Sequence, residues 1–185
     1  KIKVTSKDKE SIAKALAVYS GFTEGLQLFS SFVILLNFPR FGKMKGMGQI
    51  ITYSIRDESL HVEAMTKLFR EFIKENIELW TDGLKKEIYQ ACRDMVTLEN
   101  RFLDLVFKQG DIEGLTKSEM QQYIKYIADR RLLQLGLKPN YKVSHNPLGW
   151  LDDVLGVEHQ NFFEGRSTSY MKAGLRGSLE KVRFA

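Results

Sequence analysis

Hydrophobic positions recur every three or four residues along four long stretches of the chain, a pattern typical of helices that bury one face. The clearest stretch runs from Ile50 to Phe72. Its predicted core-facing stripe consists of Ile51, Ser54, Ile55, Glu58, His61, Val62, Met65, Phe69 and Phe72. Two ionisable side chains, Glu58 and His61, therefore lie in a stripe that is otherwise mostly apolar.

Breaks in the pattern separate the first predicted helix from the second. The first runs from about residue 6 to residue 37, and Pro39 ends it, because the residue before a proline avoids helical geometry. The second runs from about residue 44 to residue 76 and carries Glu58 and His61.

The third predicted helix begins at Thr81 or Asp82 and continues to about Gln109, where Gly110 fits a left-handed cap. Its apolar stripe consists of Leu84, Ile88, Ala91, Met95, Leu98, Phe102 and Leu105. The stripe is continuous over the whole helix, which predicts packing against the other helices along its length.

The fourth predicted helix begins at a capping box formed by Thr116 and Glu119 and closes at Gly136. No stretch alternates like a strand, so the sequence predicts an all-α protein, most simply an antiparallel four-helix bundle. We expect residues 1–155 to form this bundle, with a short helical piece at its end. Residues 156–185, with frequent glycines and few apolar groups, are expected to form a flexible tail.

The stretch from residue 21 to residue 38 contains a single ionisable side chain, Glu24. Few polar neighbours surround it, so we expect a buried acid. One interpretation is a protonated glutamate that is hydrogen-bonded to a hydroxyl, because desolvation favours the neutral form. The other interpretation is a carboxylate that a metal ion keeps ionised.

Glu58 and His61 lie one helical turn apart, so both side chains can bind the same ion. Such a pair is more often a solvated glutamate beside a hydrogen-bonded histidine, but Glu24 adds a second inward acid and makes a metal site the stronger hypothesis. Carboxylates with one imidazole suit iron or manganese better than structural zinc. A dinuclear site in a helical bundle needs a Glu from each of two helices and a Glu-x-x-His from each of two others. This chain supplies one of each, and its sequence contains no second Glu-x-x-His or Asp-x-x-His.

Charge and cysteine content narrow the possible functions. The net charge is +5, but residues 166–185 hold five basic side chains and one acidic one, so the remainder is nearly neutral and nucleic-acid binding is not predicted. The single cysteine, Cys92, excludes an internal disulfide and predicts a core residue in a reducing, cytoplasmic compartment. No transmembrane or export segment is predicted.

Four motifs resemble the small, radical-generating β subunit of class I ribonucleotide reductase. In chain order they are FTEGLQLFSSF around Glu24, SIRDESLHVEAM around Glu58 and His61, NPLGWLDD at 146–153 and FFEGRSTSY at 162–170. The resemblance covers nearly the whole chain but only the C-terminal half of the family's length. It implies a ferritin-like helical bundle and a part in ribonucleoside-diphosphate reductase, which reduces ribonucleotides to deoxyribonucleotides.

The resemblance also implies a metal centre of two iron ions, or of manganese and iron, for which Glu24, Glu58 and His61 would be ligands. The family's other ligands and its radical tyrosine belong to the N-terminal half, which this sequence does not include. The ligand set in this chain is therefore only half of a centre.

Three further residues would act in radical transfer by the same resemblance. Asp57 would link the metal centre to the transfer path, Tyr170 would relay the radical to the large subunit, and Glu164 would act near that tyrosine. The apolar pocket around the metals would be lined by Leu28, Phe32 and Ser54.

The leading hypothesis is a C-terminal piece of a split small subunit. It would assemble with a separate N-terminal fragment, with a second small-subunit copy and with the large catalytic subunit, and alone it would expose a large apolar interface. Two alternatives remain open. One is a homodimeric ferritin-like di-metal oxidase in which each copy gives one Glu and one Glu-x-x-His, and the other is a non-catalytic interaction fragment.

Overall fold

The computed structural model describes residues 9–157, with side chains described as far as Val154. This part of the chain is helical, and its only extended pairing is an isolated bridge between Ile112 and Leu115, so the all-α prediction is confirmed. None of the helices in the described range is both long and apolar enough to cross a membrane. The predicted tail lies outside the described residues, except for its first two, which belong to the last helix.

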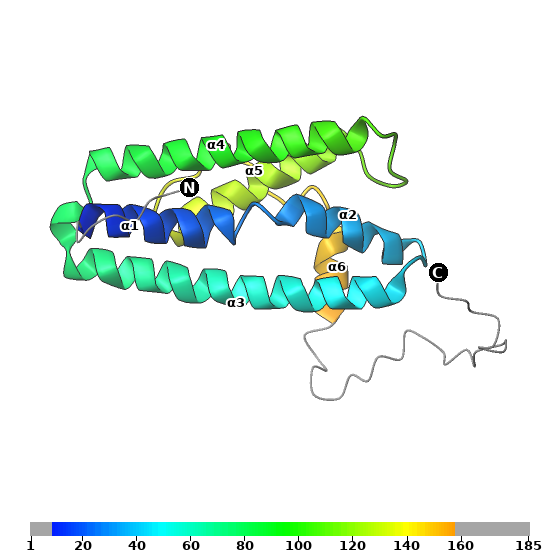
Figure 1. Cartoon of the computed structure of the whole chain (residues 1–185), viewed down its shortest axis with the longest axis horizontal. Coiled ribbons are helices and arrows are strands. Elements are labelled where there is room, and N and C mark those ends of the chain that lie inside the picture. The colour runs from blue at the N-terminus through cyan, green and yellow to red at the C-terminus, as the bar shows by residue number, and fades with distance from the viewer. Residues whose placement is uncertain (1–8, 158–185) are drawn as a thin grey trace, which may run out of the picture.

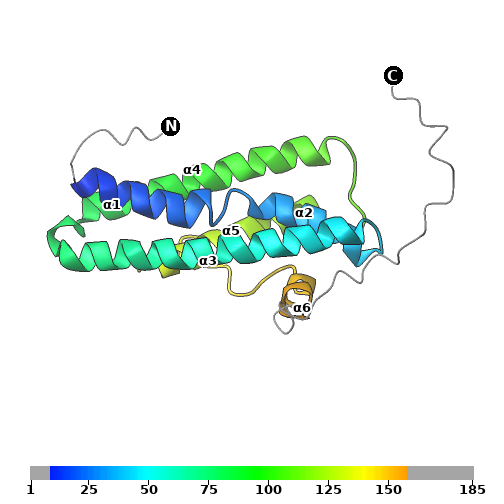
Figure 2. The ribbon, with the colours of Figure 1, turned by 60° about the horizontal axis from the view of Figure 1, so that its bottom comes forward.

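The elements are α1 (Lys9–Val18), the π-helix η1 (Tyr19–Thr23), α2 (Phe29–Arg40), α3 (Lys45–Glu75), the 3₁₀-helix η2 (Ile77–Leu79), α4 (Asp82–Phe107), α5 (Lys117–Gln134) and α6 (Trp150–Val157). Together α1, η1 and α2 form one interrupted helix, which runs antiparallel to α3 (Figure 1). α4 and α5 complete the predicted antiparallel bundle, while α6 lies across its axis (Figures 1 and 2).

The prediction of one continuous helix over residues 6–37 is wrong, because this segment is interrupted. α1 gives way to η1, and residues 24–28 form turns before α2 begins. The wider π-turn brings the Glu24 N–H to the Tyr19 carbonyl at 3.0 Å and the Gln27 N–H to the Phe22 carbonyl at 3.1 Å, five residues back in each case. Apolar residues keep helical spacing on both sides, so periodicity alone does not reveal the break.

Pro39 does not end the helix as predicted but lies inside the last turn of α2, which ends at Arg40. Its ring packs on the beginning of α3, where a Cβ atom added to Gly48 would lie 2.3 Å from Pro39 Cγ. Gly48 therefore permits this close approach between the two helices.

The buried stripe of α4 is shifted by about one position from the predicted one. Its buried residues are Leu84, Ile88, Cys92, Val96, Glu99 and Leu103. Leu98 and Leu105, which the prediction placed in the stripe, are 52% and 67% exposed. The prediction followed apolar residue types, whereas the buried face follows steps of four and three residues that pass through Cys92 and Glu99. Cys92 is a free, buried thiol as predicted, and burial raises its pKa to about 12.

The predicted helix starts are confirmed where the structure shows capping bonds. The Thr81 hydroxyl accepts a hydrogen bond from the Leu84 N–H at 3.2 Å at the start of α4. Thr116 and Glu119 form the predicted capping box at the start of α5. Gly136 follows that helix with a φ of 83°, a left-handed conformation that glycine adopts without strain.

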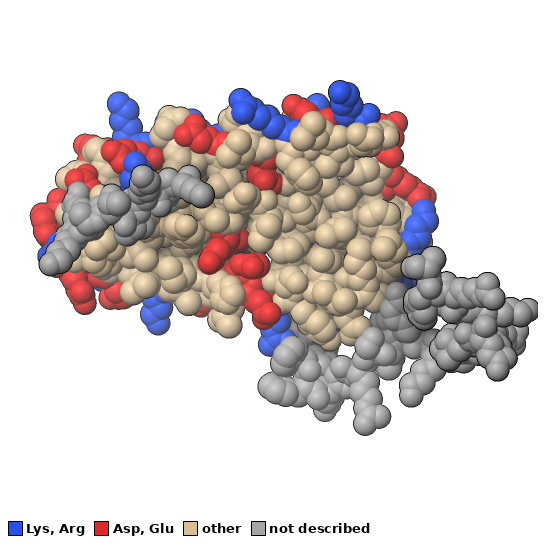
Figure 3. All heavy atoms as spheres, viewed as in Figure 1, with Lys and Arg blue, Asp and Glu red and all other residues tan. Residues whose placement is uncertain are grey.

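One face of the bundle is almost free of charge. Residues 25–39 and 46–55, which contribute to α2 and to the first half of α3, contain no Asp, Glu, Lys or Arg. Leu28, Ile50 and Tyr53 expose 40%, 65% and 38% of their surface in or beside these segments. Figure 3 shows a broad surface of uncharged side chains over this part of the molecule, which we call the uncharged surface.

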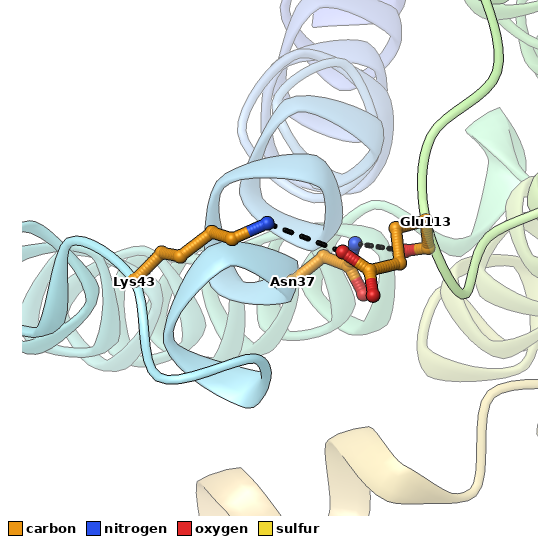
Figure 4. Close-up of polar contacts among 3 residues, drawn as sticks. All are labelled: Asn37, Lys43 and Glu113. Carbon is orange, nitrogen blue, oxygen red and sulfur yellow. Dashed lines mark hydrogen bonds and ion pairs between the residues drawn. The ribbon is translucent and has the colours of Figure 1, made fainter.

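Polar contacts join α2 to the loop between α4 and α5 (Figure 4). The Asn37 side-chain amide donates to the Glu113 carbonyl at 2.8 Å, and Lys43 Nζ lies 3.1 Å from the Glu113 carboxylate. Arg40 donates to the Gly114 carbonyl at 3.0 Å and lies over the Trp150 ring, 4.9 Å from its centroid. α6 is therefore held at the same end of α2 as this loop.

The segment between α5 and α6 is fixed by a buried carboxylate. Asp129 accepts backbone hydrogen bonds from Asn140, Tyr141 and Val143 at 2.7, 2.8 and 3.1 Å. Asp129 is 3% exposed, so these three N–H groups replace the water that its charge would otherwise require. The position of the chain leading to α6 is thus set from the core of the bundle.

Candidate metal centre

Three side chains, one from the turns after η1 and two from α3, converge beside the break in the first helix. Glu24 directly follows η1, and Glu58 and His61 lie on α3, the helix that packs against η1. One ligand atom from each side chain lies within 4.8 Å of the other two. Within residues 9–154, whose side chains are described, no other group of three or more acidic, histidine or cysteine residues converges in this way.

Glu24 is the member of this group that most needs a partner. Its Oε2 atom is buried and accepts no hydrogen bond. A buried carboxylate oxygen without a partner costs free energy, because it has lost its water and gained no compensating contact. A cation held between Glu24 and the two α3 side chains would supply that contact, so the residues present fit a bound metal ion.

Glu58 and His61 are more exposed than the stripe predicted. Their side chains are 25% and 58% exposed, and His61 Nδ1 lies 3.7 Å from Glu58 Oε2. Neighbouring stripe residues such as Val62 and Phe69 are buried, so the pair occupies the edge of the stripe. The prediction that His61 faces the core is therefore wrong for this chain alone, whereas Glu24 and Glu58 are both partly buried and the Glu24 Oε2 atom is buried.

The surroundings of the ligand group are apolar. Figure 3 shows a group of acidic atoms beside the uncharged surface, at the break in the first helix and over α3 beneath it. Two exposed side chains of the uncharged surface lie in the same segments as the ligands: Leu28 is in the turns at residues 24–28 with Glu24, and Tyr53 is on α3 with Glu58 and His61. Exposed apolar side chains around a ligand group are typical of an interface that another polypeptide covers, and not of an ordinary polar surface.

The other predicted site residues occupy different environments. Phe32 is buried in α2, and its ring meets the Phe29 ring edge-to-face with centroids 5.8 Å apart. Ser54 is half-buried one turn before Glu58 and donates its hydroxyl to the Ile50 carbonyl at 3.2 Å. Asp57 is exposed on α3. Tyr170 and Glu164 lie outside the described residues.

Two buried charged residues contact the break, and neither was predicted. Glu99 of α4 accepts hydrogen bonds from the hydroxyl and the backbone N–H of Ser30, and burial raises its pKa to about 7. Arg131 of α5 donates from Nε to the Gly25 carbonyl at 2.7 Å, and burial lowers its pKa to about 10. Helical steps of four residues from Ile88 through Cys92 to Val96, followed by a step of three, would have reached Glu99.

Comparisons with known proteins agree on one family. A model described as "Ribonucleotide reductase, small chain" matches residues 1–147. A protein of Invertebrate iridescent virus 3, named as a probable ribonucleoside-diphosphate reductase small subunit, is 46% identical over 170 residues, which are 91% of this chain and 45% of that protein. The ribonucleoside-diphosphate reductase subunit beta of Chlamydia pneumoniae is 38% identical over 162 residues, which are 87% of this chain and 46% of that protein.

The structure agrees with the sequence comparisons. The ribonucleotide reductase R2 subunit from Clostridium botulinum superposes with a TM-score of 0.70 and 29% identity over 78% of this chain and 44% of that one. The predicted ferritin-like helical fold is therefore confirmed. The chain spans about half the length of the curated relatives it matches.

Proposed function

This chain belongs to the ribonucleotide reductase small-chain family, and we propose that it is the C-terminal half of a radical-generating small subunit. In this function Glu24, Glu58 and His61 supply half of a dinuclear metal centre, and helices from elsewhere supply the rest. The observation that supports the proposal best is the convergence of three ligand atoms within 4.8 Å. One of the three residues also has a buried oxygen without a partner.

The composition of the ligand group favours iron, or a manganese and iron pair. Two carboxylates and one imidazole are ligands that suit these metals. A dinuclear centre in a helical bundle is completed by four glutamates or similar acids and two histidines, so the three residues here are half of such a set. When bound, a centre of this kind supplies the oxygen-dependent oxidation from which the protein radical is formed.

The residues of this chain have separate tasks in the proposed subunit. Glu24 presents its carboxylate from the break in the first helix, while Glu58 and His61 are held one turn apart on a long, regular helix. Asp57, the neighbour of Glu58, connects the centre to the radical-transfer path. Tyr170 relays the radical to the large subunit, with Glu164 nearby, and the large subunit reduces the ribonucleoside diphosphate.

The uncharged surface supports a helical partner. A polypeptide that covers it must present its own apolar stripe and must direct acidic and histidine ligands toward Glu24, Glu58 and His61. The N-terminal fragment of a small subunit has this chemistry. A second small-subunit copy and the large catalytic subunit complete the proposed assembly.

Metal analysis tests the proposal directly. We expect the mixture of this chain with a separate N-terminal fragment to bind two metal ions per pair, and the chain alone to bind fewer. Glu58→Ala and His61→Ala should lower the metal content of the mixture, whereas Glu63→Ala, an exposed glutamate two residues after His61, should not. Two tightly bound metals and a stable radical in the isolated chain would refute the split arrangement.

The half set of ligands also favours one alternative, a homodimeric di-metal oxidase. If two copies of this chain met at a two-fold axis beside the ligand group, each copy would contribute one Glu and one Glu-x-x-His, and the dimer would have the full number of ligands. The native mass of the metal-loaded protein separates the two functions, because the alternative requires two copies of this chain and no other polypeptide. A non-catalytic role would be favoured if Glu58→Ala and His61→Ala left the reductase activity of the assembled complex unchanged.

A further inference from the structure

The break between η1 and α2 leaves backbone groups without their helical partners. In a continuous helix the Gly25 carbonyl would accept the Phe29 N–H, but that N–H donates to Leu26 at 3.1 Å instead. On the other side of the break, Leu28 at the start of α2 provides no side-chain cap. An acceptor before the break and donors after it therefore need partners from outside the helix.

Two buried side chains from other helices supply these partners. Arg131 Nε of α5 donates to the released Gly25 carbonyl at 2.7 Å, and Glu99 of α4 accepts the hydroxyl and the N–H of Ser30 in the first turn of α2. Arg131 suits its helix end, because a cation is favourable beside terminal carbonyls, and the Glu99 carboxyl offers oxygen acceptors to the hydroxyl and the N–H at the start of α2. Arg131 and Glu99 are 7% and 4% exposed.

The approach of Arg131 depends on a missing side chain. A Cβ atom added to Gly25 would lie 2.7 Å from Arg131 Nε and 2.6 Å from the Gly21 carbonyl, both closer than real contacts allow. Gly21 in turn lies against α5, where an added Cβ would be 2.9 Å from Leu135 Cδ1. The two glycines therefore let α5 press directly on the backbone that carries Glu24.

Burial of Arg131 is not explained by an ion pair. Its polar contacts within the described residues are the Gly25 carbonyl and the Gln134 side chain at 2.9 Å, and its guanidinium lies over the Phe29 ring, 5.0 Å from the centroid. A buried guanidinium without a carboxylate partner is costly. Two of its three contacts are with residues at the break, which indicates that its position serves that segment.

We propose that Arg131 is a positioning residue for the metal ligand Glu24. By fixing the Gly25 carbonyl, Arg131 fixes the peptide that follows Glu24 and so the direction from which the Glu24 carboxylate reaches Glu58 and His61. Glu99 holds the other side of the break in place. This inference rests on the proposed metal centre, and the competing explanation is that Arg131 only packs α5 into the bundle.

The test uses the full chain, Mn²⁺ as the probe, and two measurements. Electron paramagnetic resonance titration gives the Mn²⁺ affinity, and hydrogen exchange of the metal-free protein reports on residues 19–30. We expect Arg131→Met to weaken Mn²⁺ binding about tenfold, the lower end of the usual effect of losing a residue that orients a ligand, and to speed exchange in residues 19–30. The matched control is Arg130→Met, because Arg130 is exposed on the same helix and bonds only Tyr126 at 2.9 Å; it should behave as wild type.

Two further variants keep the test decisive if Arg131→Met does not fold. Arg131→Lys keeps the charge but loses the planar guanidinium, and should weaken Mn²⁺ binding by an intermediate factor. Gly25→Ala disturbs the same contact from the opposite side and should reproduce the loss seen with Arg131→Met. Because a Cβ atom at residue 25 would also lie 2.6 Å from the Gly21 carbonyl, the contact is supported as the cause only if the Arg131 variants weaken binding as well.

The outcomes separate this inference from the proposed metal centre. If Glu24→Ala abolishes Mn²⁺ binding while folded Arg131 variants bind it normally, Arg131 is structural and the inference is wrong, whatever happens to the melting temperature. The same conclusion follows if exchange in residues 19–30 is unchanged. If Glu24→Ala itself leaves Mn²⁺ binding intact, the proposed centre fails and the inference fails with it.

Discussion

Glu99 should make the stability of this protein fall as the pH rises toward neutrality. Burial raises the pKa of its carboxyl from 4.5 to about 7, an effect that its hydrogen bonds from Ser30 only partly oppose. The folded state therefore holds the proton more tightly than the unfolded state does. The stabilisation is fully present below pH 4.5 and is lost as the pH rises through 7.

The size of the effect follows from the two pKa values. Each tenfold change in proton affinity is worth about 1.4 kcal/mol, so the change from 4.5 to about 7 corresponds to roughly 3 kcal/mol. This is a large fraction of the stability of an ordinary domain. Because Glu99 is 4% exposed, solvent screening should reduce the figure only modestly.

Urea unfolding of wild type and Glu99→Gln, at low protein concentration and at several pH values between 4.5 and 8, measures this effect. The amide cannot titrate but can still accept a hydrogen bond from Ser30, so the wild type should lose about 3 kcal/mol relative to the variant as the pH rises. Glu87→Gln is the matched control, because Glu87 is a half-exposed glutamate on the same helix. A difference between wild type and Glu99→Gln that stays constant with pH, or that grows in the opposite direction, would refute the reasoning.

Three other predictions test separate parts of the molecule. Asp129→Asn should lower the free energy of unfolding by about 2 kcal/mol, measured against the exposed control Asp153→Asn, because the carboxylate accepts three backbone N–H groups. Tyr170→Phe should abolish ribonucleotide reduction by the assembled complex while metal analysis finds the centre occupied; retained turnover would contradict a radical relay there. Sedimentation should show the isolated chain self-associating as concentration rises and becoming monodisperse with the proposed N-terminal fragment, since the uncharged surface is otherwise open to water.

Much of the fold could be predicted because the information is local. Helix starts were readable at Thr81 and Thr116, where a side chain caps backbone groups three residues away. The buried face of α4 was harder to predict from the sequence. The apolar residue types indicated Leu98 and Leu105, whereas the buried face includes Glu99. Glu99 is tolerated in this buried position only because Ser30, on another helix, donates hydrogen bonds to its carboxyl group.

The candidate site was readable from composition rather than from periodicity. A single acid in the uncharged stretch from residue 21 to residue 38 marked Glu24 as unusual, and the structure shows its Oε2 atom buried and unpartnered. Composition did not indicate whether His61 is buried or exposed. The exposure of His61 depends on what covers α3 from outside. In the proposed assembly the burial of His61 would depend on a partner, so no local pattern in this chain could indicate it.

The break in the first helix and the proposed metal centre both depend on residues that are not near them in the sequence. The break is stabilised by Glu99 and Arg131, which bond residues 69 and 106 positions away in the chain, so no local pattern could have revealed it. In the same way, Glu24, Glu58 and His61 can hold a dinuclear centre only with ligands that lie beyond this ligand group. In the proposed function the two dependences meet at Glu24, because Arg131 of α5 bonds the Gly25 carbonyl directly after it and Glu99 of α4 bonds Ser30 on the other side of the break. In the proposed assembly the backbone of Glu24 would be held by contacts within this chain, whereas Glu58 and His61 would become buried only through a partner that covers α3.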